Sequence, residues 1–277
     1  QVREVWRRLK RNRAAIVGGI IVILFVATAI LAPWLSPYHP NEGDLTKRLK
    51  APDREHLLGT DPLGRDVLSR VIYGARISLQ IQIVAVVIAM FVGTILGMVG
   101  GYYGGTFDNL IMRLMDILLA FPGIFLAIAI IAVLGPGLTN LMLAAGIYSI
   151  PQFARIVRGS VLSLKEKEFV EAARAVGEKD FNILFRYLLP NSMAPIIVQT
   201  TLRMATVLLT ASGLSFLGLG VQPPTPEWGA MLSNARAYLI TAPHVATVPG
   251  LAIMMVVMGF NLFGDGLRDS LDPRLRD

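Results

Sequence analysis

The feature that most constrains this chain is a series of long stretches without charge. No Asp, Glu, Lys or Arg occurs in six intervals, which are residues 14–41, 77–107, 117–154, 187–202, 204–226 and 237–264. A helix needs about 20 mostly apolar residues to cross the hydrocarbon core of a bilayer. Only 16% of the 277 residues are charged, whereas an average soluble domain has about 25%. The sequence therefore predicts an all-α integral membrane protein.

Glycine and proline divide these intervals into spans. Gly135-Pro136-Gly137 breaks 117–154 into a helical hairpin, and a cluster of prolines marks 220–227 as a loop. Six spans are predicted, at about 14–35, 78–101, 112–134, 139–157, 192–218 and 245–264. We expect a basic N-terminus (1–13), a membrane domain (14–264) and a C-terminal tail (265–277). An interfacial helix at 66–76 should lead into the second span.

Lysine and arginine residues predict how the chain is inserted. They concentrate in the N-terminus, between spans four and five, and in the tail: Arg3, Arg7, Arg8, Lys10, Arg11, Arg13; Arg158, Lys165, Lys167, Arg174, Lys179, Arg186; Arg268, Arg274, Arg276. With six spans these segments share one side, and the positive-inside rule makes that side cytoplasmic. The external loop 36–77 is also basic and is an exception to this rule. The other long external loop, 219–244, has Arg236 as its single Lys or Arg residue. Both termini are predicted to be cytoplasmic, and the net charge of +7 requires no nucleic-acid partner.

Residue types exclude several functions. The chain has no Cys, and His39, His56 and His244 show no metal-ligand spacing. No Lys follows a Gly, so the phosphate-binding motif of P-loop ATPases is absent. We expect no catalytic residue, metal or cofactor in this chain, and any ATP must be hydrolysed by another subunit. The alternative is an ion-coupled secondary transporter, which would usually carry membrane-embedded carboxylates or paired broken helices.

The segment 158–191 contains signals for two short helices. Ser163-Leu164-Lys165-Glu166 has the form of a capping box, and 168–176 favours a helix that Gly177 can end with a left-handed turn. Asp180 can cap a second helix, which Pro190 interrupts. Four apolar residues of that helix are spaced to form one stripe: Phe181, Leu184, Phe185 and Leu188. The segment is either a protruding knob or an amphipathic loop on the membrane.

Two further patterns lie within the spans. Gly93, Gly97, Gly101 and Gly105 recur every four residues, which favours close helix packing, either against another subunit or within this chain. Arg113 and Asp116 are three residues apart and can form an ion pair.

The order Glu171-Ala172-Ala173, Gly177, Leu189-Pro190 resembles the EAA loop of ABC importer permeases, EAA-x3-G-x9-I-x-LP, with Tyr187 at the isoleucine position. A second block, His56 to Arg70 (HLLGTDPLGRDVLSR), resembles the signature of C-type permeases of dipeptide and oligopeptide importers. Further blocks extend the resemblance over nearly the whole chain. They include 101–116, Pro223 to Gly229 (PPTPEWG) and 264–273.

The resemblance implies a type I ABC importer permease fold in a bacterial inner membrane. By resemblance, a coupling helix with Glu171, Ala172, Ala173 and Gly177 docks on an ATPase subunit. The signature residues of the external loop are Gly59, Thr60, Asp61, Gly64, Arg65 and Asp66. The implied partners are a B-type permease, two ATPase subunits that bind ATP and Mg²⁺, and an external binding protein that delivers a peptide. Relatives in this family carry dipeptides, longer peptides, nickel chelates or glutathione, and the sequence does not choose among them.

Overall fold

The computed structural model describes residues 7–271, and its regular structure over that range is helical. The longer helices are α2 (Arg13–Leu35), α3 (Val67–Tyr103), α4 (Gly105–Ala120), α5 (Gly123–Leu134), α6 (Leu138–Leu164), α10 (Met193–Phe216) and α12 (His244–Leu271). The shorter ones are η1 (Leu45–Lys47), α7 (Glu168–Ala175), α8 (Asp180–Asn182), the π-helical turn η2 (Ile183–Leu188), α9 (Leu189–Asn191), α11 (Trp228–Ala235) and η3 (Arg236–Tyr238). The predicted all-α class is confirmed. Arg3, Arg274, Arg276 and the ends of the predicted N-terminus and tail lie outside the described residues.

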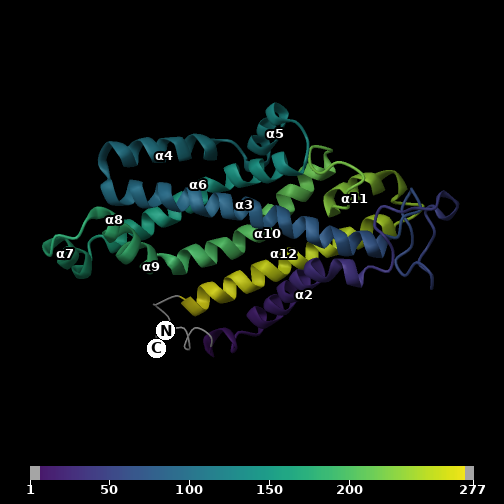
Figure 1. The fold of residues 1–277 in the computed structure, drawn as a ribbon, viewed down its shortest axis with the longest axis horizontal. Helices are drawn as coiled ribbons and strands as arrows, with labels where there is room; N and C mark the ends of the chain where they lie inside the picture. Colours follow the sequence, from purple (N-terminus) through teal and green to yellow (C-terminus); the bar gives the residue numbers. More distant parts are fainter. Residues whose placement is uncertain (1–6, 272–277) are drawn as a thin grey trace.

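Apart from α5, the longer helices run roughly along the longest axis of the molecule (Figure 1). The short helices α7, α8 and α9 lie at one end, here called the α7 end. Residues 36–66, here called the signature loop, lie with α11 at the other end, the α11 end. The start of α2 and the end of α12 both point toward the α7 end, and the Asn12 amide there donates to the Asp269 carboxylate at 3.5 Å. The segments predicted to share one side of the membrane therefore lie at one end of the molecule.

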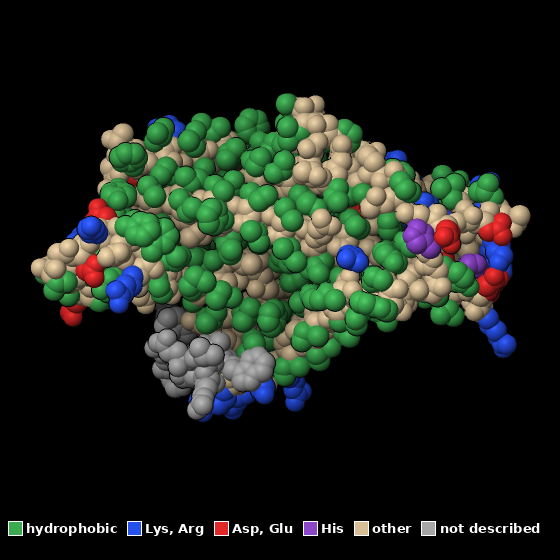
Figure 2. Space-filling view, in the orientation of Figure 1, with side chains coloured by type: hydrophobic (Ala, Val, Ile, Leu, Met, Phe, Trp, Pro, Cys, Tyr) green, Lys and Arg blue, Asp and Glu red, His purple; other side chains and the backbone are tan. Residues whose placement is uncertain are grey.

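Hydrophobic side chains cover the middle of the visible face, and most charged side chains gather toward the ends and the lower edge (Figure 2). This distribution is expected for a chain whose middle faces lipid. Within residues 7–271, four helices are long and apolar enough to cross a bilayer: α2, α3, α10 and α12. The bent pair α4–α5 raises the number to five if it counts as one span. Helix α6 has 27 residues but falls short in composition because polar residues such as Asn140, Gln152 and Arg155 dilute its apolar run. The count of six spans therefore stays a prediction.

The span predicted at 112–134 is broken by a bend, and whether it counts as one span stays a prediction. Helices α4 and α5 meet at an angle of 93°. Phe121 is extended, with φ −90° and ψ 134°, and Pro122 follows it as the N-cap of α5. The proline ring disfavours helical geometry at the residue before it, and proline has no N–H to continue the hydrogen-bond ladder. The local chemistry of Pro122 thus replaces one straight helix by two.

The predicted interfacial helix at 66–76 is not a separate element. Asp66 caps α3 by accepting from the Ser69 N–H at 2.7 Å, and the helix then continues unbroken from Val67 to Tyr103. Its 37 residues correspond to roughly 55 Å at 1.5 Å per residue, longer than the hydrocarbon core of about 30 Å. Helix α3 therefore extends beyond a bilayer and joins the α11 end to the α7 end.

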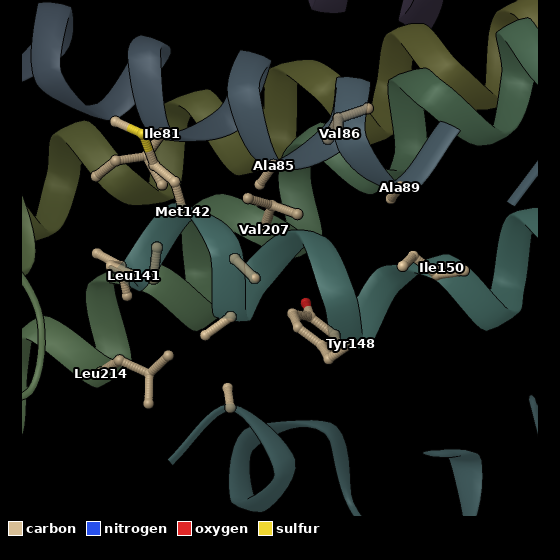
Figure 3. Close-up of a cluster of buried hydrophobic side chains, with 14 of the residues drawn as sticks. Ile81, Ala85, Val86, Ala89, Leu141, Met142, Tyr148, Ile150, Val207 and Leu214 are labelled. Atoms are coloured by element: carbon tan, nitrogen blue, oxygen red, sulfur yellow. The ribbon is translucent and has the colours of Figure 1, made fainter. Parts of the chain in front are cut away.

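The core forms where α3 packs on α6. Ile81, Ala85 and Ala89 of α3 face α6, while side chains of α10 close the cluster from a third direction (Figure 3). A Cβ on Gly93 would lie 2.5 Å from the Phe153 Cβ, and one on Gly97 would lie 2.5 Å from the Ala154 carbonyl oxygen. Three members of the predicted glycine stripe, Gly93, Gly97 and Gly101, thus pack within this chain, whereas a Cβ on Gly105 would meet nothing within 4 Å.

The predicted pair of Arg113 with Asp116 is wrong. Asp116 bonds instead to Arg155 of α6, with 2.5 Å between the guanidinium nitrogen and the carboxylate oxygen. A second pair lies nearer the start of α4, where the Asp108 carboxylate accepts from both Nε and Nη2 of Arg158 at 2.5 and 2.6 Å. Helix packing overrides the local spacing, because α6 brings its own arginines alongside α4.

Candidate functional site

The segment from Lys165 to Asn191, here called the knob, carries the predicted EAA residues. Its first helix, α7, ends in a Schellman motif: the Glu178 N–H donates to the Ala173 carbonyl at 3.1 Å, and the Gly177 N–H donates to the Arg174 carbonyl at 3.0 Å. Gly177 occupies the left-handed position of this motif with φ +79°. The predicted glycine turn is confirmed, and the knob protrudes from the helix bundle (Figure 1).

The predicted caps of the knob are wrong. Ser163 lies inside α6, which continues to Leu164, so no capping box forms; the N-cap of α7 is Lys167. The N-cap of α8 is Lys179, and the Asp180 carboxylate accepts instead from the Tyr102 hydroxyl at 2.7 Å. An S-x-x-E pattern that follows an apolar helix can be absorbed into that helix when its side chains do not bond to the backbone.

The EAA residues divide into exposed and buried members. Glu171, Ala172 and Gly177 are exposed, whereas Ala173 is only 4% exposed and packs toward the bundle. Apolar Val176 is 79% exposed beside them. The outer face of α7 therefore presents small and apolar groups next to a carboxylate, with Ala173 beneath.

The predicted stripe on the second helix is split. Leu184 and Leu188 are buried, but Phe181 is 67% and Phe185 43% exposed. The stripe assumed 3.6 residues per turn, whereas Ile183–Leu188 forms a π-helical turn, which rotates later side chains out of register. Ile183 is fully buried in place of the two rings.

A buried cluster joins the knob to the spans. Tyr102 and Met98 of α3 pack in it with knob side chains such as Val170 and Ala173. The guanidinium of Arg174 lies 5.3 Å from the centre of the Tyr102 ring, within the range of a cation–π contact.

All six signature residues are buried: Gly59, Thr60, Asp61, Gly64, Arg65 and Asp66. Asp61 is the centre of the network. Its carboxylate accepts from the Leu63 and Arg65 N–H groups at 2.8 and 3.0 Å, and from the Arg65 Nε at 2.7 Å. Arg70 approaches the same carboxylate, with Nε 3.5 Å from Oδ2. This ion cluster ties the signature loop to the start of α3.

The remaining signature residues attach the loop to its surroundings. His56 Nδ1 lies 2.9 Å from Asp66 Oδ1, and Asp66 also accepts from the Ser69 hydroxyl at 2.7 Å. The Thr60 hydroxyl accepts from the Lys50 N–H at 2.9 Å and donates to the Lys47 carbonyl. The signature is thus a structural network, with its polar groups turned inward.

Gly59 and Gly64 are required by both backbone and space. Each has φ +73°, a conformation that strains other residues. A Cβ on Gly59 would lie 2.6 Å from Nε2 of His244. One on Gly64 would overlap the carbonyl group of Asp44. These glycines let the loop fold tightly against itself and against α12.

Three buried residues at the α11 end were not predicted as site residues. Arg70 donates through Nη1 to the Pro40 carbonyl at 2.8 Å and to the Pro224 carbonyl at 3.4 Å. Glu227 is 1% exposed and caps α11 by accepting from the Gly229 and Ala230 N–H groups; its burial raises its pKa. The Trp228 indole donates to the Val71 carbonyl at 3.0 Å. Glu227 and Trp228 lie in the PPTPEWG block, which the sequence analysis identified as a pattern without giving these residues a role.

The outer surface of the signature loop is more loosely tied. The backbone N–H of His56 and the ammonium of Lys50 bond to Asp53 and lower its pKa to about 2. Lys47 pairs with Glu55 close by. Within residues 7–271, no group of three or more His, Asp or Glu side chains could hold a metal ion.

Two family models match this chain, one near its start and one over its larger remaining part. Residues 89–277 match the family described as "Binding-protein-dependent transport system inner membrane component". Residues 1–52 match the "N-terminal TM domain of oligopeptide transport permease C". The inward-facing MetNI methionine ABC transporter has a chain of similar fold, with a TM-score of 0.60 at 17% identity, covering 73% of this chain and 96% of that one. An amino acid ABC transporter gives a TM-score of 0.56 at 14% identity, covering 73% and 94%.

Two curated relatives are similar over almost the full length. The glutathione transport system permease protein GsiD of Shigella flexneri serotype 5b (strain 8401) is 53% identical over 274 residues, 99% of this chain and 90% of the relative. The protein of the same name from Escherichia coli O6:K15:H31 is 51% identical with the same coverage. The family is a transport permease of ABC importers and not an enzyme. The chain therefore belongs to the inner membrane components of binding-protein-dependent transport systems, as a permease of an ABC importer.

Proposed function

We propose that this chain is one of the two permease subunits of an ATP-driven importer of short peptides, including glutathione. The relatives named for glutathione transport and the match to an oligopeptide permease domain support this cargo class, because glutathione is itself a short peptide. A B-type permease supplies the other half of the pathway. Two ATPase subunits bind ATP and Mg²⁺, and an external binding protein delivers the cargo.

The observation that carries the proposal is the exposed outer face of α7. Glu171, Ala172 and Gly177 lie on this face beside the exposed Val176. Small side chains allow another backbone to approach closely, and an apolar group gains by being covered. An ATPase subunit is the partner that the EAA spacing implies. Ala173 serves from beneath by keeping α7 close to the buried cluster.

The same proposal orients the molecule. The α7 end faces the cytoplasm with both termini, and the α11 end faces outward. Exposed apolar side chains of the α11 end, such as Leu45, Leu57 and Ile240, are available to the binding protein. The buried signature residues support that surface from within. ATP-driven closure of the two ATPase subunits displaces the knob, and α6 and α10, which flank the knob in the chain, carry the movement into the spans.

Reconstitution tests this function. The chain, a B-type permease, two ATPase subunits and a binding protein in liposomes should accumulate labelled glutathione or dipeptide only with ATP. This chain alone should accumulate neither under an imposed proton or sodium gradient. Gradient-driven uptake by the lone chain would instead support the ion-coupled secondary transporter.

The docking face is tested in the same complex with Ala172→Trp. The indole should clash with the ATPase subunit and reduce its co-purification by about tenfold or more. The matched control is Ala51→Trp, since Ala51 is an exposed alanine of the signature loop. Full co-purification of the ATPase subunits with Ala172→Trp would contradict docking on α7.

A further inference from the structure

The connection between the knob and α3 is not provided by the chain itself. The knob follows α6 and precedes α10, so those two helices move with it through covalent bonds. Helix α3 ends at Tyr103, more than sixty residues before α7 begins at Glu168. Any movement of the knob reaches α3 only through side-chain contacts.

Tyr102, in the last turn of α3, makes contact with both arms of the knob. Its hydroxyl donates to Asp180 Oδ1 at 2.7 Å, in the arm after Gly177. Its ring lies 5.3 Å from the guanidinium carbon of Arg174, in the arm before Gly177. The side chain is 8% exposed and belongs to the cluster that contains Ala173 and Ile183. One residue therefore connects the two arms to each other and to α3.

Helix α3 is placed to transmit a displacement at Tyr102. Close contacts fix its last turns to α6: a Cβ on Gly101 would lie 3.0 Å from Val161, and the Lys165 ammonium donates to the Gly101 carbonyl at 3.1 Å. At its other end, Asp66 and Arg70 anchor the signature loop. Because α3 runs the length of the molecule as one unbroken helix (Figure 1), a shift at Tyr102 is carried to the α11 end.

We propose that Tyr102 is a coupling residue, which passes movement of the knob to α3 and so links ATP hydrolysis to opening of the pathway at the α11 end. Tyr102 is a positioning residue: it acts through Arg174 and Asp180 and touches no substrate. The inference rests on the proposed function, since it needs an ATPase subunit to move the knob. It adds a third helix to the two that the chain connects directly.

The test uses the complete reconstituted importer and measures two quantities, peptide transported per ATP hydrolysed and stimulation of ATPase activity by the binding protein. Tyr102→Ala should lower transport per ATP by about tenfold or more, within the usual range of couplings between sites. Tyr102→Phe keeps the ring on Arg174 and loses the bond to Asp180, so it should lower the ratio by about fivefold. In both variants ATPase activity should become less dependent on the binding protein.

The neighbouring tyrosine supplies the matched control. Tyr103 is 52% exposed and packs edge-on against Tyr102 with ring centres 5.1 Å apart. Tyr103→Phe should leave transport per ATP unchanged. Asp180→Ala should reproduce Tyr102→Phe, and the double variant Tyr102→Phe/Asp180→Ala should be no worse than either single one, because both remove the same bond.

The outcomes separate this inference from the proposed function. If the wild-type complex gives no ATP-driven uptake, the proposed function fails. If the wild type transports and the assembled Tyr102→Phe complex keeps the wild-type ratio and stimulation, the inference is wrong. A lower Tm with an unchanged ratio in Tyr102→Phe would also overturn it, because a residue that only supports the fold affects stability and not coupling. If Tyr102→Ala fails to assemble, Tyr102→Phe and Asp180→Ala decide the question.

Discussion

The two ends of this permease are built in opposite ways. At the α11 end, the signature loop carries its charged signature residues inside, where Asp61, Arg65 and Arg70 form a buried ion cluster. At the α7 end, Glu171 and Gly177 lie on the surface, and a buried cluster of mostly apolar side chains lies beneath them. The two motifs, each identified by its resemblance to a family pattern, thus have different physical arrangements.

The difference shows what each end can do. Buried ion pairs with several hydrogen bonds have one favourable arrangement, so the signature loop is rigid relative to α3. The knob is attached to α3 by two hydrogen bonds, from Tyr102 to Asp180 and from Lys165 to the Gly101 carbonyl. One cation–π contact and apolar packing around Tyr102 complete the attachment. Such contacts are individually weak and tolerate small displacements. An end that must follow a moving partner is therefore expected to resemble the knob, and an end that must keep its shape is expected to resemble the signature loop.

The largest effect is expected from breaking the ion cluster of the signature loop. Asp61→Ala leaves Arg65, which is 7% exposed, without its counter-ion. Removing one partner of a buried pair costs about 3–5 kcal/mol of unfolding free energy. Thermal unfolding of the purified complex in detergent should show a clearly lower Tm. The control is Asp53→Ala on the outer surface of the same loop, which loses a partly exposed pair with Lys50 and the bond from the His56 N–H. Its Tm should fall much less, because water screens these partly exposed groups; equal losses in both variants would contradict the comparison.

A smaller effect is expected from a matched pair of glycines, one at each end. Gly64 and Gly177 both have a left-handed φ, +73° and +79°. A methyl group on Gly64 overlaps the Asp44 carbonyl, whereas one on Gly177 meets nothing within 4 Å. Gly177→Ala should lower the local stability of the knob by the left-handed strain alone, about 1–2 kcal/mol. Gly64→Ala should lower the free energy of unfolding by about 3 kcal/mol or more, because steric overlap is added to the strain.

Two measurements separate these variants. Gly64→Ala should lower the Tm of the whole complex. Gly177→Ala should leave the Tm nearly unchanged and raise the rate of tryptic cleavage at Lys179, because only the knob loosens. A larger loss of Tm in Gly177→Ala than in Gly64→Ala would mean that the knob, and not the signature loop, is the rigid end.

The fold followed from the sequence where one strong local signal decided it. Charge-free runs predicted the long helices, and Gly177 predicted the turn in the knob. The bend between α4 and α5 also had a local signal in Pro122, which the division into spans did not use. The capping box failed because helix α6 could absorb Ser163 without a competing side-chain bond.

The candidate sites were harder to predict because their contacts join distant residues. The EAA spacing identified α7, but not that Ala173 is buried or that Tyr102 lies against it. The signature block identified Asp61 and Arg65, but not that Arg70 reaches the carbonyl of Pro224. A periodic pattern or a motif identifies residues that are related along the chain. It does not predict which distant segments pack against each other.

The smallest effect compares two ion pairs that join α4 to α6 near the α7 end. The Asp108 side chain is 12% exposed and forms two hydrogen bonds with Arg158, whose side chain is 33% exposed. Asp116 and Arg155 are 55% and 52% exposed. Asp108→Asn should destabilise by about 1–2 kcal/mol, because charge-assisted bonds are lost in partial burial. Asp116→Asn should cost less than about 0.5 kcal/mol, because water screens an exposed pair. Raising the salt concentration should further reduce the loss of stability in Asp116→Asn and should leave most of the loss in Asp108→Asn. Equal changes in Tm for the two variants at every salt concentration would mean that burial does not distinguish these pairs, and the contrast between weakly and strongly held contacts would then not extend to α4.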